Sequence, residues 1–143
     1  MTIKRILKSK GTDAPIVPPS ARIHEVIDAL ELEDVGALVI SADGKNIDGI
    51  ITERDVVRGL QKYGADVLEH TVSDLMTTDV ITCTADDAVI GVMALMDDRN
   101  IRHVPVVDNG KLAGIVSIMD IVKLRLNEVQ NEAEAMRSYI SNT

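Results

Sequence analysis

The chain has 143 residues, of which 45% are hydrophobic, so it is long enough and apolar enough to fold around a core of its own. It carries 15 Lys and Arg residues against 23 Asp and Glu residues, and its net charge of −8 disfavours general binding to nucleic acid or to anionic membranes. No apolar run approaches the length of a membrane span. The lone Cys83 cannot form an intrachain disulfide, so a cytoplasmic protein is expected.

The first patterned region spans residues 12–62 and follows a short N-terminal segment, residues 1–11. Ile16 and Val17 form an apolar pair that predicts a short strand. A helix is expected after the Pro-Pro-Ser run that ends at Ser20, which is the expected N-cap. The apolar residues of this helix recur at the i, i+3, i+4, i+7 spacing of an amphipathic helix. They are Ile23, Val26, Ile27 and Leu30.

Two further apolar runs, residues 37–40 and 47–51, flank the turn-forming pair Asp43-Gly44. Runs of this kind around Asp-Gly predict a hairpin-like pair of strands. Another helix is expected to begin at Thr52. The region therefore predicts the order strand, helix, strand, strand, helix.

A connection over residues 63–78 leads to a second region, residues 79–125, which repeats this order. The connection is expected to contain a short helix over residues 72–76. Thr84 and Asp87 resemble a capping box at the start of the first helix of the second region. The remaining counterparts are the strand pair Ile81-Thr82, the helix face Val89, Val92, Met93 and Met96, the runs 104–107 and 112–116 around Asn109-Gly110, and a last helix starting at Ser117.

The final region, residues 126–143, is expected to form a C-terminal helix and tail. Apolar residues at alternating spacings of four and three mark a heptad seam, which is too short to establish a coiled coil by itself. Such a helix either docks on its own domain, or pairs across a dimer or covers a cleft. The seam consists of Val122, Leu126, Val129, Ala133, Met136 and Ile140.

One sequence pattern occurs twice, as GIITERDVVR at residues 49–58 and as GIVSIMDIVK at residues 114–123. Both copies read Gly, two β-branched residues, a hydroxyl residue, two variable positions, Asp, two β-branched residues and a cation. Each half is too small to be stable alone. The duplication therefore predicts a pseudo-twofold molecule whose halves pack sheet to sheet and enclose a cleft that receives equivalent groups from both sides.

The repeated hydroxyl-x-x-Asp motif, Thr52 to Asp55 and Ser117 to Asp120, has two interpretations. As a capping box it only starts a helix, because the hydroxyl accepts a backbone N–H and the acid complements the positive helix end. In a cleft, an ionised Asp also suits the vicinal hydroxyls of a ribose, since it accepts several hydrogen bonds and donates none. The candidate cations for a phosphate are Arg54, Arg99, Arg102 and His103.

The doubled motif, together with Arg-His-Val-Pro-Val-Val at 102–107, closely resembles tandem cystathionine-β-synthase (CBS) domains over about residues 12–125. The layout, with a short N-terminal segment and a C-terminal helix, resembles small stand-alone bacterial CBS-pair proteins. The resemblance implies an α+β fold of two pseudo-symmetric β-α-β-β-α motifs packed through their sheets into one pair, plus a C-terminal helix. It also implies a disc-like homodimer.

The same resemblance implies adenosine-containing ligands in the clefts, with ribose and phosphate held by the motif and by basic residues of the other half. The second copy has Ile118-Met119 where the first has Glu53-Arg54, so the Asp55 site is the better candidate for a charged nucleotide. The second site is expected to be weaker, empty or suited to a less charged ligand. The implied residues are Thr52, Arg54, Asp55, Arg102 and His103 for the first site, Ser117 and Asp120 for the second, and backbone at Val17, Pro18 and Thr82 for the bases.

We therefore expect a non-catalytic sensor that binds an adenine nucleotide and signals to an unidentified effector protein. AMP is the first choice, with ADP, ATP, NAD(H) and S-adenosylmethionine as alternatives. A module that only assembles a partner, with its motifs serving as helix caps, is the second hypothesis, and an enzyme would have no visible catalytic group. Three scattered histidines and one cysteine predict no metal site, and Cys83 is expected to be a buried, inert thiol.

Overall fold

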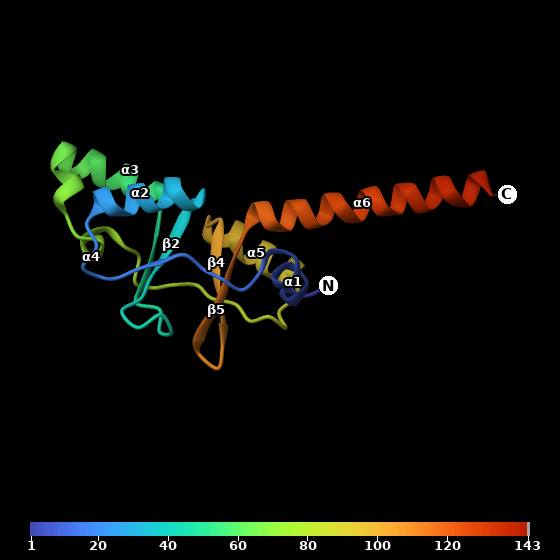
Figure 1. Ribbon diagram of the computed structural model, residues 1–143, viewed down its shortest axis with the longest axis horizontal. Helices are drawn as coiled ribbons and strands as arrows, with labels where there is room; N and C mark the ends of the chain where they lie inside the picture. The colour runs from blue at the N-terminus through green and yellow to red at the C-terminus, as the bar shows by residue number, and fades with distance from the viewer. Residues whose placement is uncertain (143) are drawn as a thin grey trace.

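The computed structural model describes residues 1–142, and its first half builds a sheet of three strands (Figure 1). The elements of this half are β1 (Ile16–Val17), α2 (Ile23–Glu33), β2 (Ala37–Ile40), β3 (Gly49–Thr52) and α3 (Glu53–Tyr63). β1 runs parallel to β2, which pairs antiparallel with β3, so that β2 is the central strand. The predicted order of strand, helix, strand, strand, helix is confirmed.

The second half repeats this arrangement with a shorter first strand. Its elements are α5 (Val89–Arg99), β4 (His103–Asp108), β5 (Lys111–Ser117) and α6 (Ile118–Ser141). β4 and β5 pair antiparallel. The parallel pairing of this half consists of one bridge, from Cys83 to Val106, inside the run 80–84 where a strand was expected. Cys83 is therefore the counterpart of Val17, and the match of Ile81-Thr82 to Ile16-Val17 is wrong by one residue. The two halves together confirm the predicted α+β fold.

The two hairpins differ in their turns. Asn109 and Gly110 both have positive φ, 51° and 76°, which is the geometry of the tight two-residue turn that Asn-Gly favours. The first hairpin has a longer loop in which the Asp43 carboxylate accepts N–H groups from Lys45 and Asn46, both at 2.8 Å. These backbone hydrogen bonds hold the pKa of Asp43 well below its ordinary value. Both turns lie where the Gly-containing pairs predicted them.

Two of the expected helix caps are wrong. The N-cap of α2 is Arg22 rather than Ser20, and its N–H donates to the Glu25 side chain at 3.0 Å. Thr84 N–H does donate to the Asp87 carboxylate at 2.8 Å, but this bond closes a turn before α5, whose N-cap is Ala88. A hydroxyl three residues before an acid thus makes the same local bond in a turn as at a helix start.

The core is aliphatic and divides into three clusters. One lies within each half, and the third joins the two sheets through Ala37, Val39, Ile50 and Ile115. Backbone also crosses this junction, since Leu112 N–H donates to the Lys45 carbonyl at 2.7 Å. The predicted sheet-to-sheet packing is confirmed.

The N-terminal segment forms α1 (Ile3–Lys10), which completes the core of the second half rather than the first. Ile3, Ile6 and Leu7 are buried in that core. The counterpart in the first half comes from the connection, which folds as the 3-10 helix η1 (Gly64–Glu69) followed by α4 (Val72–Leu75). The short helix predicted in the connection is confirmed.

Glycines show that α1 and α4 occupy equivalent places. A Cβ added to Gly49 would lie 2.7 Å from Met76 Sδ and 2.9 Å from the Thr77 carbonyl oxygen. A Cβ added to Gly114 would lie 2.9 Å from Leu7 Cδ2 and 3.5 Å from the Thr12 carbonyl oxygen. Gly49 therefore makes room for the chain that follows α4, and Gly114 makes room for α1 and the chain that follows it.

Cys83 is buried in the core of the second half, where its backbone bridges Val106 of β4. Burial raises the pKa of its thiol to about 11, and the nearby Asp87 carboxylate acts in the same direction. The native protein is therefore expected to react with a thiol reagent at about pH 8 about 100-fold more slowly than the protein unfolded in guanidinium chloride. The absorbance of the thiolate that the reagent releases measures both rates. Equal rates for the native and the unfolded protein would contradict the burial of Cys83.

The C-terminal helix does not dock on its own domain. Only the first turns of α6 contact the rest of the chain, through α1, α5 and β5, and the remainder projects away from the body (Figure 1). The seam residues from Val122 onward are all exposed. Of the two predicted arrangements, docking on its own domain is wrong.

Within residues 1–142, no helix is both long and apolar enough to cross a membrane.

Candidate functional site

The first motif sits where β3 turns into α3. Thr52 is the N-cap, and Asp55 lies at the third helical position. The Asp55 carboxylate accepts the Thr52 N–H at 2.9 Å through Oδ2, while the Asp55 N–H points back to Thr52 Oγ1 at 3.4 Å. The capping-box interpretation is thus confirmed. These bonds fix the orientation of Asp55, and an ionised carboxylate keeps further acceptor capacity for a ligand.

Asp55 also lines a pocket of about 590 Å³ between the two halves. Its walls are formed by β3 and α3 of the first half, by the chain that leads into the second half, and by the end of α5 and the start of β4. Its lining residues are Gly36, Ile50, Thr52, Glu53, Arg54, Asp55, Val57, Arg58, Thr77, Asp79, Val80, Ile81, Arg99, Asn100, Ile101, Arg102 and His103. The size is in the range of small-molecule sites.

Arginines from both halves meet in this pocket. Arg54 comes from the motif itself, and its guanidinium donates to the Asn100 carbonyl across the cleft at 3.1 Å. Arg99 and Arg102 come from the other half, as the repeat predicted. Arg58, one turn after Arg54, is a further cation that the sequence interpretation missed. Guanidinium groups bind phosphate in a bidentate manner, so this rim suits a phosphorylated ligand.

His103 lies against the first half, where Gly36 makes room for its ring. A Cβ added to Gly36 would lie 3.1 Å from His103 Cε1 and 3.2 Å from Nε2. Burial lowers the pKa of His103, and the nearby charge of Lys10 lowers it further. At neutral pH His103 is therefore an uncharged hydrogen-bonding group, and the positive charge of the pocket comes from the arginines.

The second motif has the same capping geometry but a different neighbour. Ser117 N–H donates to Asp120 Oδ2 at 2.8 Å, and Asp120 N–H donates to Ser117 Oγ at 3.2 Å. Lys10, from the end of α1, reaches the same Oδ2 at 2.6 Å. Burial alone would raise the pKa of Asp120, but the hydrogen bonds from Lys10 and Ser117 outweigh it and the pKa is lowered. The carboxylate of the second site already has an internal cationic partner.

The residues expected to meet the base fall outside the Asp55 pocket. Val17 packs on the core of the first half, and Pro18 and Thr82 do not line the pocket. The chain just before Thr82 lines it instead, through Thr77, Asp79, Val80 and Ile81. The repeat could have indicated this segment, because Thr77 and Thr12 adjoin the two motif glycines in the same way.

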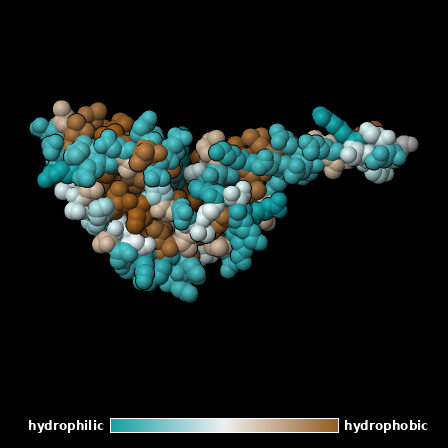
Figure 2. Space-filling view, viewed as in Figure 1, coloured by the Kyte–Doolittle hydropathy of each residue, from teal (hydrophilic) through white to brown (hydrophobic). Residues whose placement is uncertain are grey.

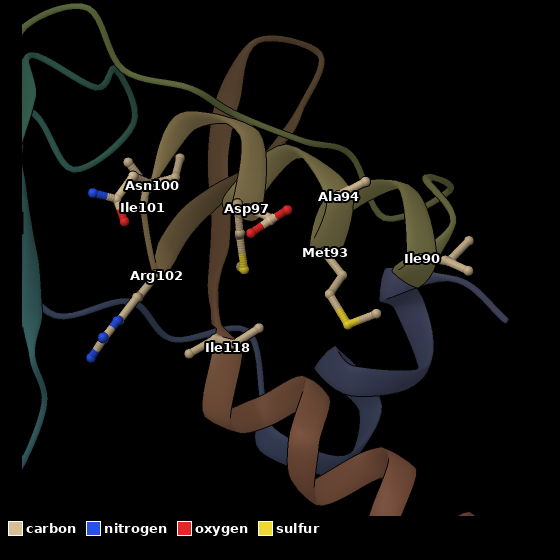
Figure 3. Close-up of a pocket in the computed structure, with 9 residues that line it drawn as sticks. Ile90, Met93, Ala94, Asp97, Asn100, Ile101, Arg102 and Ile118 are labelled. Carbon is tan, nitrogen blue, oxygen red and sulfur yellow. The ribbon is translucent and has the colours of Figure 1, made fainter.

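A second hollow of about 500 Å³ lies between α5 and the start of α6, and it shares Asn100, Ile101 and Arg102 with the first (Figure 3). Figure 3 shows Met93 and Ile118 pointing into the space between the two helices. Its lining is mostly apolar. Within the described part of the chain, no group of three His, Cys, Asp or Glu side chains could hold a metal ion.

Comparison with known proteins gives a consistent result. The family model described as the CBS domain matches residues 4–62 and 72–127. A CBS domain-containing protein of Agrobacterium tumefaciens, ATU1752, is similar in structure with a TM-score of 0.84 and 40% identity, over 87% of this chain and 99% of that one. The mitochondrial CBS domain-containing protein CBSX3 of Arabidopsis thaliana is 33% identical over 97% of this chain and 71% of its own length.

One similar structure contains adenosine compounds. It is the CBS domain pair of protein MJ0100 in complex with 5′-methylthioadenosine and S-adenosyl-L-methionine. The likeness has a TM-score of 0.76 and 31% identity, over 90% of this chain and 98% of that one.

Proposed function

The chain belongs to the CBS domain family, and from that premise we propose that it is a non-catalytic regulatory module that binds an adenine nucleotide in the Asp55 pocket. One observation carries the proposal. A carboxylate fixed by a helix cap and arginines from both halves face the same space between the halves. The carboxylate suits the ribose diol, and the arginines suit phosphate.

AMP is the proposed first ligand, with ADP, ATP and NAD as further candidates. The complex of MJ0100 supports an adenosine group in a site of this family. The charges of the pocket separate the candidates. Four arginines line it together with the carboxylates of Glu53, Asp55 and Asp79, so a phosphate adds favourable contacts that a sulfonium group would not. The nucleotides are therefore preferred here over S-adenosylmethionine.

A thermal-shift panel of adenosine, AMP, ADP, ATP, NAD and S-adenosylmethionine tests this function. A ligand present at about 100 times its Kd stabilises the fold by about 2.7 kcal/mol, so AMP is expected to raise the Tm by several degrees. Adenosine should raise it less, because it lacks the phosphate. If no compound of the panel moves the Tm, nucleotide binding fails, and the alternative of a ligand-independent assembly module gains.

Regulation requires that an effector protein distinguish the ligand-bound form from the free form. The halves meet at the pocket, so a ligand that prefers one relative packing of the halves shifts that equilibrium by its differential affinity. An effector protein would read this change, and the module is proposed to act as a homodimer, as the family resemblance implies. A cytoplasmic location stays a prediction, supported by the single, buried cysteine.

A further inference from the structure

The projecting part of α6 carries an apolar stripe that the nucleotide site does not explain. Met119 is 55% exposed, Leu126 56%, Val129 46% and Met136 63%. Beyond Leu124, which packs on the core, the helix has no buried residue within the described chain. Helices of this length without tertiary contacts are marginal in water, so the outer turns need a partner to stay helical.

The stripe follows a strict heptad spacing. Starting at Met119 rather than Val122, apolar residues occupy alternating a and d positions along the exposed length of α6. The exposure of Met119 in the structure adds this residue to the seam at the start of α6, so that the seam spans three heptads. This is the narrow a/d pattern of a two-stranded coiled coil rather than the wider face of a helix docked on a globular domain. The seam positions are Met119, Val122, Leu126, Val129, Ala133, Met136 and Ile140.

We propose that α6 pairs with α6 of a second copy of this chain as a parallel, in-register coiled coil. The flanking charges specify this partner. With Ala133 at an a position, Glu132 takes the preceding g position and Arg137 the following e position. In a parallel homodimer, g of one helix faces e of the next heptad in its partner, so Glu132 and Arg137 attract each other twice by symmetry.

The antiparallel arrangement is disfavoured by the same charges. When the seams overlap fully in opposite directions, g faces g and e faces e. Glu132 then faces its own copy, and Lys123 faces Arg137. Like charges at such positions destabilise the pair, so the charge pattern favours the parallel arrangement.

The base of the stripe continues onto the body of the molecule. Ile118, which precedes Met119 at the start of α6, lines the apolar hollow between α5 and α6, where Ile90 and Met93 are exposed (Figure 3). Hydrophobic residues gather on this part of the surface in Figure 2. A second copy held by α6 therefore meets a further apolar surface at the root of the helix, which extends the contact beyond three heptads.

Sedimentation equilibrium tests the pairing. The full chain is expected to be a dimer at micromolar concentration, and Leu126→Glu, which places a charge on the seam, is expected to weaken the dimer by at least about 100-fold. Asn131→Glu is the matched control, because it adds the same charge on the outer f position and should leave the dimer intact. A monomeric parent, or a Leu126→Glu variant as dimeric as the control, overturns the proposal. This readout needs no nucleotide, so it does not depend on nucleotide binding; a dimer that survives Leu126→Glu overturns the pairing of α6 and leaves the proposed homodimer in place.

Cysteine cross-linking tests the direction. In a Cys83→Ala background, Ala133→Cys places two thiols across the parallel seam within disulfide reach, while Asn131→Cys places them outside it. Mild oxidation is expected to link the first variant and not the second on a non-reducing gel. Equal linkage of both variants, or no link at position 133, overturns the parallel register.

A charge swap tests the same register. Glu132→Arg should weaken the dimer about tenfold, and adding Arg137→Glu should restore the dimer. If the double variant stays as weak as Glu132→Arg, the parallel register is overturned.

Discussion

Asp55→Ala is expected to reduce the affinity for AMP by on the order of 100-fold, because the ribose loses its charged acceptor. Each hydrogen bond to an ionised group is worth about 1.5–3 kcal/mol, and a vicinal diol supplies two donors. The loss of stability should be smaller, about 1 kcal/mol, since the fold loses only the bonds that Asp55 makes with Thr52 at the start of α3. Isothermal titration gives the affinity, and denaturant unfolding gives the stability.

Asp120→Ala is the matched control for this experiment. It removes the same capping carboxylate from the equivalent place in the second half. A loss of stability at least as large, since Lys10 also loses its partner, without a large loss of AMP affinity would separate the binding role of Asp55 from its capping role. If Asp55→Ala binds AMP as tightly as the parent protein, Asp55 does not hold the ribose.

Lys10→Met is expected to raise the number of adenosine molecules bound per chain from one toward two, because the second site lacks the motif arginine and suits an uncharged ligand. In the structure, Lys10 Nζ lies 2.6 Å from Asp120 Oδ2, so a ribose that used this carboxylate would have to displace the ammonium group. The pair is partly buried, with 31% of the Lys10 side chain and 16% of the Asp120 side chain exposed, so displacement carries a desolvation cost. Removing the lysine removes that competitor. Isothermal titration with adenosine measures the stoichiometry.

Lys8→Met controls for the loss of one positive charge from the same helix, because Lys8 is exposed near the same end of α1. It should leave one site per chain. The double variant Lys10→Met, Asp120→Ala should also return to one site if the new ligand depends on Asp120. An unchanged stoichiometry in Lys10→Met would show that Lys10 does not close the second site.

Features that depend on local sequence could be predicted well. The hydroxyl-x-x-Asp caps at Thr52 and Ser117 need only a short segment, and the Asn109-Gly110 turn needs only two residues that accept positive φ. The duplication then indicated the sheet-to-sheet packing and the meeting of Asp55 with Arg102 and His103. A repeat carries long-range information because its two copies must pack in equivalent ways.

Features that depend on distant or non-repeated residues could not be predicted. Lys10 and Asp120 lie near opposite ends of the sequence, and α1 has a counterpart in α4 that its own sequence does not resemble. The counterpart of Val17 is Cys83 rather than Thr82, and this register is set by pairing with the distant strand β4, so no local pattern reports it. Arg58 is the cation that ends the repeated pattern, but the sequence alone did not show that it faces the same pocket as Arg54.

The positions of α1 and α4 bear on how the molecule comes apart. The helix that precedes each repeat packs on the other repeat. α1 packs into the core of the second repeat, and α4 packs into the core of the first. A cut just before η1 leaves neither repeat with a complete interior, since Ile3 and Ile6 stay with the earlier piece while Val67 and Val72 stay with the later one. Heating should therefore melt both repeats in a single cooperative step.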